Sequence, residues 1–301
     1  MRAFAAPRTV RDYVLYGERR LRAARVGFGH GTDNARDEAA WLVAGALGIA
    51  PQALAAHLAR RPDRGAAARI RALLAARIRT RQPLAYLLHE AWFAGRAYYI
   101  DPRAIVPRSL IGEFLAPGAP SPLADPEIST VLDLCTGSGA LAIAAAYAFP
   151  AARVDAVDLS ADALAVAARN VRRHGLAARV NLIQSDLFTA LAGRRYDLIL
   201  SNPPYVPRAD MAALPREYRA EPALALVAGD DGLALALPIL RTAPHHLTAD
   251  GRLVLELGAT RAALESRFPD QAFLWLSTVG DESVGYWHRD DLLAWAQQTR
   301  R

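Results

Sequence analysis

The chain has 301 residues, 52% of them hydrophobic and 22% charged, which is the composition of a globular protein long enough for two domains with their own cores. No apolar run approaches the roughly 18 residues of a membrane span, and residues 1–8 lack the apolar stretch of a secretory signal. The single cysteine, Cys135, excludes an internal disulfide, so we expect a reducing, cytoplasmic environment and no membrane.

Charge is distributed unevenly along the chain. Residues 1–88 hold 16 Arg and 6 acidic residues, whereas the remaining 213 residues hold 20 Arg and 24 acidic residues. A genomic codon bias explains why Lys is absent, but it does not explain this asymmetry. The basic part favours an acidic partner such as RNA or a ribosomal particle, and a solvated helical face is the alternative.

The first 88 residues predict a helical domain. One helix carries the apolar positions from Val10 to Leu21, and a second begins after a cap at Asp33 or Asn34. Further helices are expected over 53–60 and 66–79.

Residues 89–126 predict a β-hairpin and a linker. We expect strands over 92–100 and 104–106, joined across Asp101-Pro102-Arg103. Residues 118–126, which are rich in Pro and Gly, then form a surface loop.

From residue 127 to 301 strands and helices alternate. Strands are expected at 131–135, 153–158, 179–184, 195–201, 252–257 and 272–278, and helices at 138–149, 160–174, 230–247 and 259–267. This alternation predicts an α/β fold with a mostly parallel, doubly wound sheet. In such a sheet the first and fourth strands are neighbours, and ligands bind outside their carboxyl ends.

A glycine loop follows the first of these strands, in the run Asp133-Leu134-Cys135-Thr136-Gly137-Ser138-Gly139. Gly137 and Gly139 allow positive φ and a close approach to a helix N-terminus, which favours a ligand carboxylate. The spacing is not the dinucleotide pattern, and no Lys follows as in a phosphate loop. Asp158 ends the next strand, where a carboxylate can accept ribose hydroxyls. Together these features favour S-adenosylmethionine over NAD.

Asp186 and Leu187 follow the third strand of the sheet. We expect Asp186 to reach the adenine amino group of the cofactor, with Leu187 and Phe188 packed on the ring. A solvated acid at a strand end is the alternative.

The tetrad Asn202-Pro203-Pro204-Tyr205 follows the buried fourth strand. The amide oxygen of Asn202 can accept one N–H of a planar amino group, and a carbonyl of the Pro-Pro segment can accept the other. Neither proline can donate a competing hydrogen bond, and the Tyr205 ring offers a flat face. An ordinary polar turn is the alternative. Because loop and tetrad end neighbouring strands, they predict methyl transfer to such an amino nitrogen.

Other reactive side chains carry no predicted chemistry. Cys135 lies in the glycine loop, away from the acceptor, so a nucleophilic role is not expected. His245-His246 has no acidic or cysteine partner in metal-ligand spacing and is expected at the surface. We therefore predict no metal site.

The chain resembles the HemK-like protein-(glutamine-N5) methyltransferases, and within them the PrmB branch, which modifies ribosomal protein L-three of the large subunit. The resemblance covers most of the chain and is carried by several motifs. They are residues 29–34, 91–93, 106–113, 133–139, 147–150, 185–188, 202–205 and 214–222. The sister branch, which modifies release factors, carries Pro-Arg-Pro-Asp-Thr-Glu where this chain has Pro107-Arg108-Ser109-Leu110-Ile111-Gly112-Glu113. The chain departs from the family pattern at residues 280–289, so the resemblance does not predict the shape of the last hairpin.

The resemblance implies a Rossmann-like S-adenosylmethionine-dependent methyltransferase domain behind an N-terminal helical domain that recognises the substrate. It implies donor contacts at residues 135–139, Asp158 and Leu187, with Asn202 touching both ligands. Residues 202–205 would hold the substrate glutamine, with Asn202, Pro203 and Tyr205 as the catalytic set. The alternatives are a release-factor glutamine methyltransferase, an rRNA or DNA N-methyltransferase, and a non-catalytic ribosome-assembly factor.

Overall fold

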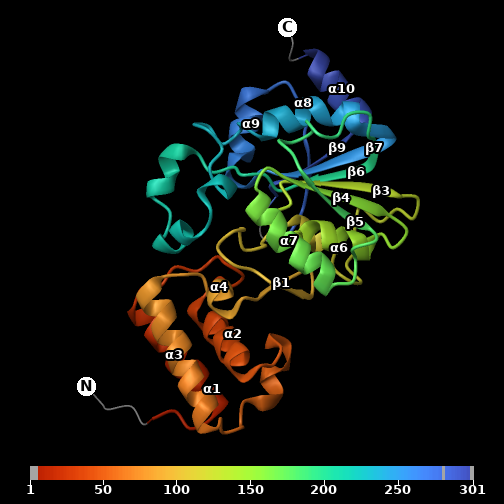
Figure 1. The fold of residues 1–301 in the computed structure, drawn as a ribbon. Helices are drawn as coiled ribbons and strands as arrows, with labels where there is room; N and C mark the ends of the chain where they lie inside the picture. Colours follow the sequence, from red (N-terminus) through yellow and green to blue (C-terminus); the bar gives the residue numbers. More distant parts are fainter. Residues whose placement is uncertain (1–5, 280–281, 299–301) are drawn as a thin grey trace. The chain divides into compact units, whose positions relative to one another are not determined.

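The computed structural model describes residues 6–279 and 282–298, so the departure at Gly280 and Asp281 lies outside the described residues. The chain forms two compact units (Figure 1). The first consists of the described residues up to Glu90 together with Pro215–Ala220, and the second of the rest. A six-residue segment from the middle of the chain therefore belongs to the N-terminal unit.

The N-terminal unit is helical, as predicted. Its α-helices are α1 (Val10–Ala23), α2 (Ala35–Leu47), α3 (Arg64–Thr80) and α4 (Leu84–Leu88). The side chain of Asn34 caps α2 by accepting from two backbone N–H groups. The predicted helix at 53–60 is wrong: the segment Pro51–His57 forms the 3₁₀ helix η1, which has no side-chain cap. Within the described residues no single helix has the length and hydropathy of a membrane span. The helices α2 and η1 have them only when taken together, and an 84° bend separates the two.

A buried arginine organises this unit. Arg77 on α3 has no exposed surface, and its guanidinium binds Glu38 at 2.8 Å and the Gly27 carbonyl at 2.7 Å. It also lies 3.5 Å from Glu217, which accepts from the Gly27 N–H at 3.0 Å. Glu217 belongs to the 3₁₀ helix η3 (Arg216–Ala220). Arg81 contacts the Glu217 carboxylate at 3.3 Å, so Arg77 compensates Glu38 and the two arginines together anchor the inserted segment.

The second unit opens with a short hairpin, β1 (Ala91–Phe93) and β2 (Arg96–Tyr98). Its turn is Ala94-Gly95, both at positive φ, so the predicted turn at 101–103 and the strand at 104–106 are wrong. Asp101 instead binds the guanidinium of Arg103 at 2.7 Å and the hydroxyl of Tyr99 at 2.7 Å, which folds this segment on itself. The short helix α5 (Ile111–Phe114) follows.

The remaining strands form one seven-stranded sheet in the order β5-β4-β3-β6-β7-β9-β8 (Figure 1). All pairs from β5 to β7 are parallel, and β9 runs antiparallel to β7 and β8. The strands are β3 (Thr130–Leu134), β4 (Arg153–Asp158), β5 (Val180–Gln184), β6 (Tyr196–Ser201), β7 (Leu247–Glu256), β8 (Leu274–Leu276) and β9 (Val284–His288). The six predicted strands are confirmed, and β9 was not predicted.

Helices cover both faces of this sheet (Figure 1). One face packs against α6 (Ala140–Ala148) and α7 (Ala161–Arg173), and the other against α8 (Ala236–His246), α9 (Arg261–Arg267) and α10 (Arg289–Gln298). Successive residues of β3 alternate between the two cores, with Val131 on the α6 side and Leu132 on the α8 side. The predicted doubly wound α/β fold is confirmed. Between β6 and β7 the described chain adds η2 (Arg208–Ala212), η3 and η4 (Ala223–Ala225).

Replacing Arg77 should destabilise the helical unit strongly. Arg77→Leu leaves Glu38 buried without its cation, whereas Glu217 keeps Arg81 at 3.3 Å. We therefore expect the free energy of unfolding of this unit to fall by about 3–5 kcal/mol. Urea unfolding followed by circular dichroism measures it. Arg79→Leu, at an exposed position of the same helix, is the control and should change the value by less than about 0.5 kcal/mol. Equal effects of the two variants would contradict this role of Arg77.

Candidate active site

The carboxyl ends of four neighbouring strands lie at one level of the sheet. Leu134 pairs with Val157 on one side and with Ser201 on the other, and Ser201 pairs with Leu255. The next residues along these strands therefore form a row at one edge, made of Asp158, Cys135, Asn202 and Glu256. The glycine loop and the tetrad open side by side where the strand order reverses, as predicted.

The glycine loop is a tight turn between β3 and α6. Its φ angles are positive at Cys135, Gly137 and Gly139, and the last of these is the residue before α6 begins. A Cβ added at Gly139 would lie 3.0 Å from the Cβ of Ala167 on α7. Only glycine fits there without strain, because the turn needs this backbone angle and α7 passes close by.

Two polar side chains hold the loop backbone. Asp158 accepts from the Gly137 N–H at 2.8 Å and from the Ser160 N–H at 2.9 Å. Asn170, buried on α7, donates to the Ser138 carbonyl at 2.9 Å and bridges to the backbone of Tyr99. Burial raises the pKa of Asp158. Each carboxylate oxygen of Asp158 keeps a further lone pair for a ligand hydroxyl.

Asp133 is a buried carboxyl group beneath the loop. Its Oδ2 accepts from the Thr136 hydroxyl at 2.5 Å and from the Ala142 N–H at 3.0 Å. Its Oδ1 has no hydrogen-bond partner among the described residues. Burial raises the pKa of Asp133 to about 7. An unpartnered acidic oxygen at this place suits a ligand that carries a positive charge.

The tetrad is fixed from both sides. The buried Ser201 hydroxyl, one residue before Asn202, donates to the Leu134 carbonyl at 2.9 Å. On the other side the Tyr205 ring packs on Gly258, where an added Cβ would lie 2.6 Å from the ring. Pro203 is buried, whereas Asn202, Pro204 and Tyr205 keep part of their surface exposed. A ligand can therefore reach the Asn202 amide and the Tyr205 ring.

Asp186 and Leu187 line a cavity of about 450 Å³ together with residues of α8, including Thr242 and His246. Leu187 has a positive φ of 44°. Phe188 is buried and stacks on His246 with ring centroids 4.7 Å apart. His245 is exposed, as expected, and His246 keeps part of its surface exposed while packing on this ring.

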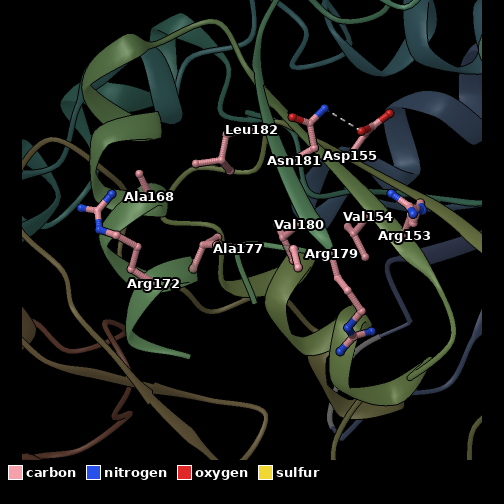
Figure 2. A pocket seen from close by; sticks show the side chains of 12 residues that line it. Arg153, Val154, Asp155, Ala168, Arg172, Ala177, Arg179, Val180, Asn181 and Leu182 are labelled. Atoms are coloured by element: carbon pink, nitrogen blue, oxygen red, sulfur yellow. Dashed lines mark hydrogen bonds between the residues drawn. The ribbon is translucent and has the colours of Figure 1, made fainter. Parts of the chain in front are cut away.

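A second cavity, of about 560 Å³, lies elsewhere in the same unit (Figure 2). It is lined by the first residues of β4 and β5, by α7 and by the segment between α7 and β5, and its arginines are Arg153, Arg172 and Arg179. These are the amino ends of the strands, opposite to the edge that carries the row. The larger cavity is therefore distinct from the candidate active site.

Known proteins are similar to this chain in sequence. Residues 121–215 match the methyltransferase small domain, and residues 14–88 match the PrmC N-terminal domain. The ribosomal protein uL3 glutamine methyltransferase of Bordetella pertussis is 51% identical over 90% of this chain and 91% of its own length. The proteins of the same name from Bradyrhizobium diazoefficiens and Burkholderia pseudomallei are 47% and 46% identical, over 93% and 95% of this chain and 90% and 96% of theirs.

The chain belongs to the ribosomal protein uL3 glutamine methyltransferases. It is a methyltransferase, and its methyl donor is S-adenosylmethionine. The residues at the glycine loop fit this donor. The loop at the N-terminus of α6 suits the donor's carboxylate, the free oxygen of Asp133 suits its positive charge, and Asp158 suits its ribose. We propose that these residues hold the donor, with Asp186 and Leu187 at its adenine.

The Cys135 thiol in the glycine loop is not suited to act as a nucleophile. Burial raises the pKa of this thiol well above its usual range, so the side chain stays neutral and is a poor nucleophile. The described residues contain no group of three His, Cys, Asp or Glu side chains placed to hold a metal ion.

Sequence reasoning missed three residues of the candidate site: Asn170, Ser201 and Glu256. Asn170 interrupts the apolar stripe of α7, where Val166, Ala167 and Val171 are buried, and a polar residue on such a stripe is a signal. Glu256 ends an otherwise apolar strand segment and is 3% exposed. Both positions could have been singled out as buried polar groups that need partners.

Asp133 should make the donor-free protein less stable as pH rises. Its folded pKa of about 7 lies above the ordinary value of 3.8, so its stabilising contribution is present below pH 3.8 and is lost as pH rises through 7. Asp133→Asn removes this titration. We expect the stability of the variant relative to wild type to rise by about 4 kcal/mol between pH 4 and pH 8, at about 1.4 kcal/mol per pH unit. Chemical unfolding at several pH values measures it, and a difference independent of pH would contradict the assignment.

Proposed function

We propose that this chain transfers a methyl group from S-adenosylmethionine to the side-chain amide nitrogen of a glutamine in ribosomal protein uL3. The observation that carries the proposal is the pairing of Leu134 with Ser201, which puts the glycine loop beside Asn202. The names and the high identity of the relatives support the choice of glutamine and of uL3.

The acceptor nitrogen is a poor nucleophile, because its lone pair is delocalised into the amide carbonyl. In the proposed mechanism the Asn202 amide oxygen accepts one N–H of the substrate glutamine, and a carbonyl of the Pro203-Pro204 segment accepts the other. The Tyr205 ring supports the flat amide. Anchoring both N–H groups from one side turns the lone pair toward the donor. When bound, S-adenosylmethionine supplies a methyl group on a positively charged sulfur.

Alignment is the main source of rate acceleration in this proposal. Holding two reactants in a productive geometry contributes up to roughly 7–11 kcal/mol. The methylated amide is strongly acidic before it loses its proton, so water or a backbone carbonyl can accept that proton. No side chain is assigned a general-base role.

We further propose that the helical unit recognises the ribosomal substrate. Exposed arginines such as Arg60, Arg61 and Arg64 precede or begin α3, and guanidinium groups suit the phosphates of rRNA in an assembling particle. A ribosomal substrate also favours a cytoplasmic location for the reaction.

Asn202→Ala should separate catalysis from donor binding. The variant loses one of the two anchors of the acceptor amide, so we expect kcat to fall at least about a hundredfold, as for the removal of one preorganised hydrogen bond in other enzymes. Donor affinity measured by calorimetry should fall far less, by at most about tenfold or 1.4 kcal/mol, because Asn202 is only one of the residues expected to touch the donor. Asn181→Ala, on the exposed side of β5, is the control. Normal turnover by Asn202→Ala would overturn the mechanism.

Incubation with radiolabelled donor separates the candidate substrates. We expect recombinant uL3 to gain one methyl group on a glutamine, found by mass spectrometry of peptides, and release factors to remain unlabelled. Label in ribosomal particles should be sensitive to protease and resistant to nuclease. Nuclease-sensitive label would instead favour an rRNA N-methyltransferase, and failure to bind the donor would favour a non-catalytic assembly factor.

A further inference from the structure

A short segment, Ile105–Leu110, runs across the carboxyl edge of the sheet, and we call it the strap. At its start Ile105 lies over the glycine loop, where a Cβ added at Gly137 would be 3.6 Å from its Cγ2. At its end the Ser109 hydroxyl and the Leu110 N–H donate to Glu256 at 2.6 Å and 2.8 Å. Because β6 lies between β3 and β7, the strap passes the end of β6, where the tetrad begins.

Glu256 holds the end of the strap. The residue is 3% exposed, and both of its bonds to the strap use the same oxygen, Oε2. Desolvation raises the pKa of Glu256 to about 7, against the hydrogen bonds from Ser109 and Leu110 and the charge of Arg108. A buried acid is costly unless it is bonded. Because Glu256 is next to Asn202 in the row, these two bonds fix the end of the strap close to Asn202.

Glu221 holds the middle of the strap. Arg108 binds it through two parallel contacts of 2.7 Å and 2.8 Å, and the Val106 N–H donates to it at 3.0 Å. Glu221 is 5% exposed and ends the segment that the tetrad begins. Paired contacts of this kind orient a guanidinium strongly. The strap is thus tied to Glu221 at its middle and to Glu256 at its end.

The end of β7 contacts the strap, and the residues that follow it contact the Tyr205 ring. Gly258, two residues after Glu256, is the residue on which the Tyr205 ring packs. Residues 107–110 of the strap keep part of their surface exposed, although Glu256 and Glu221 beneath them are buried. The strap therefore presents a fixed, accessible surface beside Asn202 and Tyr205.

We propose that the strap is the wall against which the polypeptide on either side of the target glutamine lies, and that Ser109 and Arg108 are positioning residues that set its shape. The proposal rests on the proposed function, since it names how that acceptor is selected. It places a specificity element in the catalytic unit itself.

Ser109→Ala tests the proposal by steady-state kinetics on uL3. The variant removes one of the two bonds that fix the end of the strap to Glu256, so we expect KM for uL3 to rise about tenfold. We expect kcat to change less than about twofold and the donor dissociation constant to stay unchanged, since Ile105 still lies over the glycine loop. The control is Ser129→Ala, because Ser129 also donates to a carboxylate, that of Asp197, at 2.9 Å, but just before β3 begins. It should leave all three constants unchanged.

Arg108→Lys gives a second reading if Ser109→Ala folds poorly. Lysine keeps the charge but cannot make the two parallel contacts with Glu221, so KM for uL3 should again rise while donor affinity holds. An unchanged KM for uL3 in both variants would overturn the strap's role. A fall in donor affinity as large as the rise in KM for uL3 would overturn it as well. Failure of the wild-type protein to methylate uL3 would instead refute the proposed function, so the two failures are distinguishable.

Discussion

The parallel pairing of β3 with β6 is the constraint on which the candidate active site depends. The register Leu134–Ser201 aligns the start of the glycine loop with Asn202, and the Ser201 hydroxyl closes the pair on the Leu134 carbonyl. A slip of one residue would turn every side chain of β6 to the opposite face. Polar groups at both ends of β6 oppose it, because Asp197 accepts from the Thr130 N–H at 2.9 Å and Ser201 donates to the Leu134 carbonyl at 2.9 Å. These contacts therefore fix the register on which the proposed methyl transfer depends.

Much of this arrangement could be predicted from sequence because its signals are local. Alternating strands and helices indicate a doubly wound sheet, and the sheet's topology implies that its first and fourth strands are neighbours. The glycine loop and the Asn202–Tyr205 tetrad are continuous motifs whose residue types show what they can bind. Even the cap of α2 at Asn34 follows from a short polar side chain before an apolar stripe.

The remainder depends on contacts between distant parts of the chain. Glu217 belongs to the helical unit through Gly27 and Arg77, which lie 190 and 140 residues away in sequence, and no local pattern marks such a partner. Glu256 meets Ser109 across 147 residues. The hairpin was misplaced for a different reason: Asp101-Pro102-Arg103 has the composition of a turn and forms a local fold, but the β-turn itself uses Ala94-Gly95.

The most direct test of the central claim is a crystal structure with S-adenosylhomocysteine bound. The account predicts the ligand's carboxylate at the glycine loop, its ribose at Asp158, and its sulfur on the side of the loop that faces Asn202. Binding in the cavity lined by Arg153, Arg172 and Arg179 at the amino ends of the strands, or a sulfur directed away from Asn202, would contradict it.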